Sequence, residues 1–572
     1  MKKAIYISLL VAISITWTQN VLAQKQDSLL HRQMELEREF NPTLRGDANK
    51  IQSLPSLPQP TIRRANTAYA TWTGRSTPPL EIALPQASSI KTDIPFQSRR
   101  GYISLAAGNY ANINGTMGLR LLHTNNNDLS ITLRHHSTNG DIRYVQEQEM
   151  RENRAKVMDN KATIDYSHTF DALQMGANVS YENVLFNYYG NSFGSTRKFE
   201  DKEQMVQVMH AGLHALSDTL ESFRYGGQIH FKHFATKYGD TPNSEPLKGN
   251  HAEAMVTLGM PFYDEQYGVG VEGGFLGVFY NSQFPDFAER GFTDYKEAKV
   301  SPFLQIKEET LNAKLGVKAL FQHTDKTKIR VVPDASIQWN VAQRTTLYAT
   351  ASGGFDDNTF LNVFNETRYI HPMQAIKPSF TSVDTKAGVK IGAIDGLRFD
   401  LWGGFRNTKD EHFWIMRHDN IETLSPLYGN LNHTHVGALL QSTLIPSVDI
   451  TLRAQKNFYK VTNATYNETE IDDAKAYNKP TFEADAQVLW QLIDPLKVSL
   501  GYHLSADRYT YFNDENVAMQ SIHALNAGAF YRISSNFSLN LQANNLLNQQ
   551  YNIWYGYPAQ GFHILGGFTF VF

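Results

Sequence analysis

The 572-residue chain contains no cysteine. This absence excludes disulfide bonds, thiolate metal sites, a cysteine nucleophile and a lipid anchor on cysteine. Charged residues are also few, at 19%, where an average soluble domain has about a quarter. The formal net charge is only −3, so the composition gives no sign of a nucleic-acid partner.

Long hydrophobic runs are missing as well. After residue 23 no run reaches the 18 apolar residues typical of a membrane-spanning helix. Residues 1–23 instead have the parts of a secretory signal: Lys2 and Lys3, the apolar stretch IYISLLVAISI, and a small-residue cleavage site at Ala23 before Gln24. The alternative is an uncleaved N-terminal anchor, for which the apolar run is short. An exported chain without spanning helices is either soluble or a closed barrel, because only helices and closed barrels satisfy every backbone group in lipid.

What the sequence does have is alternation with a period of two. In FSLNLQAN, Phe537, Leu539 and Leu541 share one face, and the polar residues between them share the other. VDITLRAQ and KVSLGYHLSA repeat the pattern. This is typical of strands with one apolar face, and it fits a β-sandwich, a propeller or a membrane barrel.

The connections between strands distinguish these folds. About 22 strands are predicted between Gly101 and Phe572, and their connections alternate between short and long. Outer-membrane barrels have short periplasmic turns, long external loops and an even strand count. The sequence therefore predicts an all-β fold, a closed antiparallel transmembrane β-barrel. Its ten short turns are expected at 124–128, 171–173, 218–219, 264–265, 308–309, 342–343, 395–396, 446–447, 494–495 and 534–536.

The end of the chain, NNLLNQQYNIWYGYPAQGFHILGGFTFVF, resembles the C-terminal signature of TonB-dependent receptors. Gln560 and Phe562 depart from that signature, which often has proline and arginine there. The resemblance implies an outer-membrane barrel of 22 strands and a transport function. The strand from Phe562 is expected to close the barrel with its apolar side outward, and Phe568, Phe570 and Phe572 to serve as the signal that the barrel-assembly machinery reads. The matching residues are Asn545, Leu546, Asn548, Tyr551, Gly556, Tyr557, Pro558, Gly561 and Phe572.

The part before the barrel does not match that family. Only residues 24–100 lie between the signal peptide and the first strand, fewer than the family's plug domain has, and no energy-coupling box is evident. Eight of the 21 prolines fall in 41–100, which disfavours long helices and central strands. This segment is expected to be a rudimentary plug that partly fills the lumen, or a periplasmic docking arm. The alternative is a disordered tether.

Two groups of residues are candidate sites. The segment from Asp356 to Ser379 is a long loop that is external in this topology and rich in aromatic residues. Such a loop suggests contact with a ligand or partner, although it would equally fold inward as a lid. His433 and His435 share a strand face and would suit a metal, but no third ligand is evident, so ordinary lumen histidines are the alternative. The candidate residues of the loop are Phe360, Phe364, Tyr369 and His371.

Three functions are compatible with this sequence. The first is a channel or transporter for a solute across the outer membrane of a Gram-negative bacterium. The second is an accessory or scaffold barrel that docks partner proteins of the periplasm or outer membrane through its N-terminal arm. The third is a barrel enzyme, for which no acid–base constellation stands out, so we expect no enzyme and no cofactor. The expected partners are outer-membrane lipid, the assembly machinery and such proteins, and no nucleic acid.

Overall fold

The structure is a computed structural model. It describes residues 99–144, 152–190, 203–217, 223–239, 245–263, 266–281, 292–324, 326–371, 376–416, 423–466 and 469–572. All of them belong to the compact unit Thr67–Phe572. The predicted signal cleavage at Ala23 and Gln24 and nearly all of segment 24–100 lie outside the described residues.

Strands dominate this unit, and its one described α-helix, α5 (Phe360–Glu366), follows β13. The strands are β1 (Gly101–Gly108), β2 (Ile113–His123), β3 (Asn127–Arg143), β4 (Glu152–Thr169), β5 (Leu173–Asn187), β6 (Glu203–Ser217), β7 (Arg224–Thr236), β8 (Lys248–Phe262), β9 (Tyr267–Tyr280), β10 (Tyr295–Lys307), β11 (Leu311–His323), β12 (Thr327–Ala342), β13 (Thr345–Asp356), β14 (Ser379–Ile394), β15 (Leu397–Met416), β16 (Leu424–Ser442), β17 (Val448–Tyr466), β18 (Thr469–Glu470), β19 (Phe482–Ile493), β20 (Leu496–Ala506), β21 (Arg508–Phe512), β22 (Glu515–Met519), β23 (Ile522–Arg532), β24 (Phe537–Asn544), β25 (Asn552–Trp554), β26 (Tyr557–Pro558) and β27 (His563–Val571).

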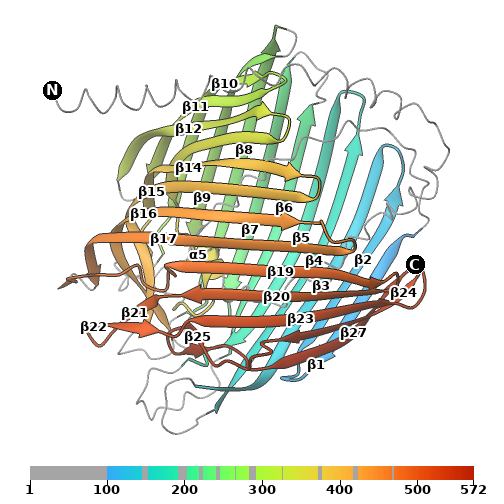
Figure 1. Ribbon diagram of the computed structural model, residues 1–572. Helices are drawn as coiled ribbons and strands as arrows, with labels where there is room; N and C mark the ends of the chain where they lie inside the picture. The colour runs from blue at the N-terminus through green and yellow to red at the C-terminus, as the bar shows by residue number, and fades with distance from the viewer. Residues whose placement is uncertain are drawn as a thin grey trace, which may run out of the picture. The chain divides into compact units, whose positions relative to one another are not determined.

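The strands form a closed antiparallel barrel (Figure 1). The main sheet has 23 strands, of which β18 is a two-residue piece that pairs only with β17. The remaining 22 form the barrel, and β27 pairs with β1 to close it, in register from Tyr102 opposite Val571 to Gly108 opposite Leu565. This confirms the predicted fold class and strand count. No helix among the described residues is long and apolar enough to cross a membrane.

Alternation along each strand gives the barrel an apolar outside and a polar inside. On β6, Met209 and Leu213 point outward with 59% and 61% of their surface exposed, while His210 and His214, the residues that follow each of them, point inward. On the closing strand, Phe568, Phe570 and Phe572 are 36–40% exposed, whereas Leu565 is buried on the inner side. Apolar side chains on the outside of a closed barrel are the arrangement that lipid requires.

All ten predicted short turns join consecutive barrel strands at one end, which we call the turn end. The other connections lie at the opposite end, the loop end. The alternation of short and long connections predicts long loops at this end, but β3–β4 and β15–β16 instead continue as paired hairpins, so that 139–143 with 152–160 and 407–416 with 424–429 are mostly strand. At 20 and 19 residues, β15 and β16 are about twice as long as a bilayer requires. The connection 507–521, which the sequence pattern did not single out, holds the separate hairpin β21–β22.

Candidate functional site

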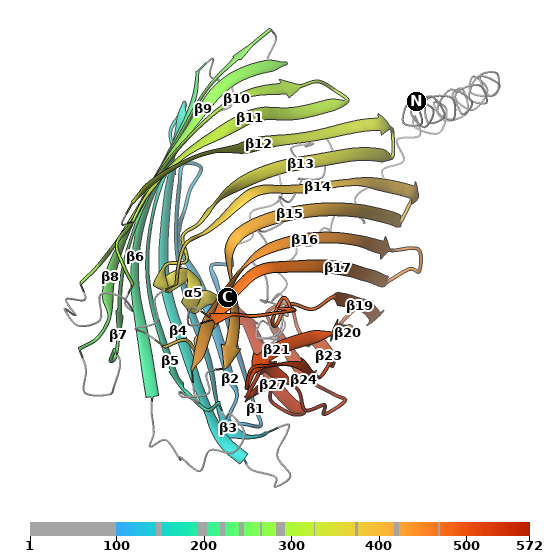
Figure 2. The same ribbon diagram turned by 90° about the vertical axis from the view of Figure 1, so that its left-hand side faces the viewer.

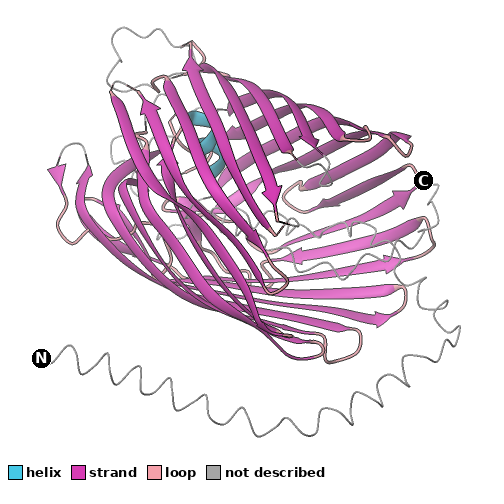
Figure 3. Ribbon diagram, turned by 90° about the horizontal axis from the view of Figure 1, so that it is seen from above, coloured by secondary structure: helices cyan, strands magenta, loops and turns pink. Residues whose placement is uncertain are grey.

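The β13–β14 connection folds into the barrel, the second of the two arrangements expected for it. Figures 2 and 3 show α5 inside the ring of strands. Phe360 and Val363 are 1% and 0% exposed, and Tyr369 after the helix is 2% exposed. A seven-residue helix is too short to be stable alone, so packing against the wall must hold it.

The apolar side of α5 packs against aromatic residues of the barrel wall. The Phe360 ring stacks on Phe234 of β7, with centroids 5.0 Å apart and planes 15° apart. Phe292, just before β10, meets Phe360 edge to face at 5.6 Å. Phe364 is half-buried and lies 5.8 Å from Phe186 of β5. Inward residues near the loop end of β5 and β7 are thus apolar, whereas inward residues farther along the same strands, such as Glu182 and Lys232, are polar.

A second connection, β24–β27, enters the lumen and meets the first. Tyr369 stacks on Tyr557 with centroids 4.0 Å apart and planes 20° apart. Tyr189, which follows β5, meets both rings edge to face, at 5.5 Å and 5.2 Å. Burial raises the pKa of the Tyr369 phenol, which therefore stays neutral at physiological pH. We call these two connections, residues 357–371 with 376–378 and residues 545–562, the lumen lid.

Polar contacts fix the lumen lid to the wall at three places. Arg368 donates two hydrogen bonds to Asp159 of β4, at 3.1 Å and 3.4 Å, and both side chains are about five-sixths buried. The Glu366 carboxylate accepts hydrogen bonds from His412 Nε2 at 2.7 Å and from Trp414 Nε1 at 3.0 Å. Finally, an isolated β-bridge joins Ile370 to Leu424.

The residues of the C-terminal signature build the second half of the lumen lid. Asn545 and Asn548 adopt left-handed backbone conformations, which asparagine tolerates better than most residues. Asn545 Nδ2 donates to the carbonyls of Gln549 and Gln560, which ties the start of the connection to its end. The signature therefore specifies a folded loop, which sequence comparison alone does not show.

Three further residues of the signature, Tyr551, Tyr557 and Pro558, are buried in the lumen. Tyr551 and Tyr557 are 6% and 0% exposed, and the carbonyl of the buried Pro558 accepts a hydrogen bond from Tyr189. Gly556 has φ +80°, the conformation that its tight turn between β25 and β26 requires. Gly561 packs against Asn548, at the point where the chain leaves the lumen for β27.

Gln560 and Phe562 are the two residues that depart from the signature. Gln560, where the family often has proline, accepts a hydrogen bond from Asn112 Nδ2 at 3.2 Å and so joins the lumen lid to the β1–β2 connection. Phe562, where arginine is frequent, is 38% exposed on the outer face.

Arg508 of β21 supports the lumen lid and gave no signal in the sequence. It is 2% exposed and donates to the carbonyls of Gln520, Asn552 and Ile553. Burial lowers its pKa to about 10, so it remains charged at neutral pH. The guanidinium therefore clamps the hairpin β21–β22 to β25.

Three candidate histidines remain. His371 is half-buried at the edge of a described range. His433 and His435 share the inner face of β16, as predicted, with ring centroids 5.1 Å apart. No group of three or more histidine, aspartate or glutamate residues suited to a metal occurs in the described part of the chain.

Neither a family model nor a curated protein sequence matches this chain. Solved structures do match in fold. A mutant ferric enterobactin receptor, PfeA, from Pseudomonas aeruginosa in complex with enterobactin has a TM-score of 0.62 at 11% identity, over 83% of this chain and 81% of that chain. The ferric-catecholate import receptor Fiu from E. coli K12 has a TM-score of 0.59 at 12% identity, over 84% and 82%. The siderophore receptor PiuA from Acinetobacter baumannii has a TM-score of 0.61 at 12% identity, over 83% and 82%.

These likenesses agree with the resemblance that the C-terminal signature predicts. The chain has the 22-strand barrel fold of TonB-dependent receptors, and its apolar exterior makes it an outer-membrane β-barrel.

Proposed function

We propose that the protein is an outer-membrane transport barrel whose own loops close the lumen and open it to admit a solute. The observation that carries this proposal is the lumen lid, buried inside the barrel with Phe360 and Tyr369 almost fully covered. A barrel of 22 strands encloses a lumen wide enough to require closure. The resemblance to siderophore receptors in fold supports a transport role for such a barrel.

The contacts of the lumen lid suit a gate. Arg368 and Glu366 are bonded to wall side chains, so the polar groups of the loop are satisfied in the closed position. They would be hydrated once the lid leaves the wall, so opening replaces these bonds with bonds to water. In this topology the loop end faces outward, and the solute would enter from that side.

A disulfide lock tests the proposal, and the absence of cysteine from the chain gives a clean background. Ile370 and Leu424 are paired in a β-bridge, and neighbouring strands lie about 4.8 Å apart, within the range for a disulfide. The double variant Ile370→Cys with Leu424→Cys should stop conductance when oxidised and recover it when reduced. Each single variant is the matched control.

Removal of the loop is the converse test. Replacing residues 358–377 with a short glycine–serine linker should raise single-channel conductance and sensitivity to large antibiotics. A variant that reaches the membrane in normal amounts without either change would refute the gate and favour the accessory role, in which the barrel need not open.

A further inference from the structure

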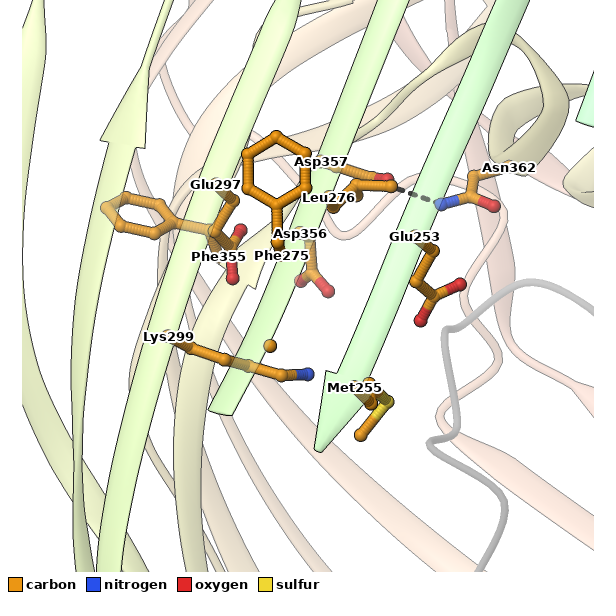
Figure 4. Close-up of a pocket in the computed structure, with 11 residues that line it drawn as sticks. Glu253, Met255, Phe275, Leu276, Glu297, Lys299, Phe355, Asp356, Asp357 and Asn362 are labelled. Carbon is orange, nitrogen blue, oxygen red and sulfur yellow. Dashed lines mark hydrogen bonds between the residues drawn. The ribbon is translucent and has the colours of Figure 1, made fainter. Parts of the chain in front are cut away.

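A cavity of about 330 Å³ lies between the lumen lid and the barrel wall (Figure 4). The wall side comes from β8, β9 and β10. The other side comes from Phe355 and Asp356 at the end of β13, and from Asp357 and Asn362 of the lumen lid. The cavity therefore has this shape only while the lid is closed.

The wall of the cavity consists of two rows of cross-strand neighbours. Glu253, Leu276 and Glu297 form one row across β8, β9 and β10. Because neighbouring strands are about 4.8 Å apart, the backbones of the two glutamates are about 10 Å apart. Met255, Gly274 and Lys299 form the next row.

Gly274 lets the lysine of the second row lie across the wall. A Cβ atom on Gly274 would lie 2.3 Å from Cε of Lys299. Without that atom, the Lys299 stem covers β9, and its ammonium group points into the cavity (Figure 4). The position of this charge is therefore set by the absence of a side chain on the neighbouring strand.

The charged groups of the cavity differ in whether they have partners. Asp356 accepts a hydrogen bond from Arg406 at 3.0 Å, Asp357 accepts one from Asn362 at 2.5 Å, and Glu297 accepts one from Tyr295.

Glu253 and Lys299, in contrast, make no hydrogen bond or ion pair within the described residues. Two opposite charges thus face the same small cavity without being joined.

We infer that this cavity binds a small zwitterion with a primary ammonium group, of the size of an amino acid or dipeptide. Glu253 would hold the ammonium group and Lys299 the carboxylate, as charge-assisted hydrogen bonds. The other carboxylates disfavour a simple anion, and the volume is at the lower end of the range for ligand pockets. This inference rests on the proposed function and names the class of solute.

Such a ligand would also favour the closed lumen lid. It would contact residues of the wall and residues of the lid, and this combination exists only in the closed state. A ligand shifts an equilibrium toward the state that it binds more tightly. We therefore expect the solute to be enclosed before it is released.

The test is isothermal titration of the full-length protein in detergent with alanyl-alanine as the probe. N-acetylation of the probe removes its ammonium group, and C-amidation removes its carboxylate. Each modification should weaken binding about tenfold or more, as expected for loss of one charge-assisted bond. Glu253→Gln should remove the discrimination against the acetylated probe, and Lys299→Met the discrimination against the amidated probe.

Glu182→Gln is the matched control, because Glu182 is an inward carboxylate that pairs with Lys161 and does not line the cavity. It should leave all three affinities unchanged. Gly274→Val should displace Lys299 and reproduce the effect of Lys299→Met.

Two results would overturn the inference: no binding of alanyl-alanine at millimolar concentration by a folded barrel, or binding that neither Glu253→Gln nor Lys299→Met alters. Tighter binding of putrescine that is insensitive to Lys299→Met would identify a site for organic cations instead. Because titration measures binding without transport, a failure here is distinguishable from a failure of the gate.

Discussion

Removing the side chain of Tyr369 should destabilise the closed state of the lumen lid without disturbing the barrel. The ring is 2% exposed and contacts Tyr557, Tyr189 and Phe186, at centroid distances of 4.0, 5.5 and 6.2 Å. Truncating a buried aromatic residue to alanine costs about 3–5 kcal/mol. Phe186 lies on β5, Tyr189 follows it, and Tyr557 belongs to the other connection of the lumen lid, so most of this loss should fall on the closed position of the β13–β14 connection.

A loss of this size converts into a large change in gating. Each 1.4 kcal/mol is about a tenfold change in an equilibrium constant, so 3 kcal/mol corresponds to about 150-fold and 5 kcal/mol to a few thousand-fold. Phe360 and the Arg368–Asp159 pair still hold the loop, so the lid should remain closed most of the time. We therefore expect openings to be about two to three orders of magnitude more frequent, in line with these changes in the closed–open equilibrium.

Single-channel recording in planar bilayers measures this change directly, and vancomycin sensitivity of the cells measures it in the membrane. Tyr369→Phe is the control, because it keeps the ring stacked on Tyr557 and removes only the hydroxyl group. Loss of one hydrogen bond costs about 1 kcal/mol, so this variant should change the opening frequency by no more than about fivefold. If Tyr369→Ala is folded by heat-modifiability but opens no more often than wild type, the lumen lid is not the gate.

Three further predictions concern assembly, topology and the N-terminal segment. Replacing Phe568, Phe570 and Phe572 of the closing strand with serine should abolish the heat-modifiable band and lead to periplasmic degradation, because polar groups on the lipid face are costly. Normal membrane yield of this triple variant would contradict the prediction. An epitope inserted at the exposed Asp472 of the loop end should be labelled on intact cells, and one at Asn126 of the turn end should not, with reversed labelling excluding the topology. Deleting residues 41–95 should by itself leave the lid closed and the conductance low. Combined with Tyr369→Ala, the deletion should give openings of larger conductance than Tyr369→Ala alone. Equal conductance would show that this segment does not fill the lumen.

The barrel itself follows from the sequence, because its signals are local. A period of two places apolar residues on one face of every strand, and short turns with Asp, Asn, Gly and Pro mark one end. Both signals need only residues that are neighbours in the chain, such as Phe537, Leu539 and Leu541. This is why the strand count, the positions of the ten turns and the orientation of the closing strand agree with the structure.

The lumen lid depends on tertiary structure. Arg368 meets Asp159 across 209 residues of sequence, and Tyr189 meets Pro558 across 369. Alternation marks Val184 and Phe186 as inward residues, but it does not show which loop will cover them. The sequence accordingly left open whether the aromatic loop reaches outward or folds inward.

The cavity, like the lumen lid, depends on tertiary structure. Nothing within β8, β9 or β10 distinguishes Glu253 or Lys299 from other inward charges such as Glu182. They acquire a common setting because strand register places them in adjacent rows and because Gly274 leaves room between them. The sequence alone determined that the chain forms a 22-strand barrel with a polar lumen, because that conclusion rests on the periodicity of the strands. Only the closed ring of strands decided which side chains meet inside it, because those contacts join residues that are far apart in the chain.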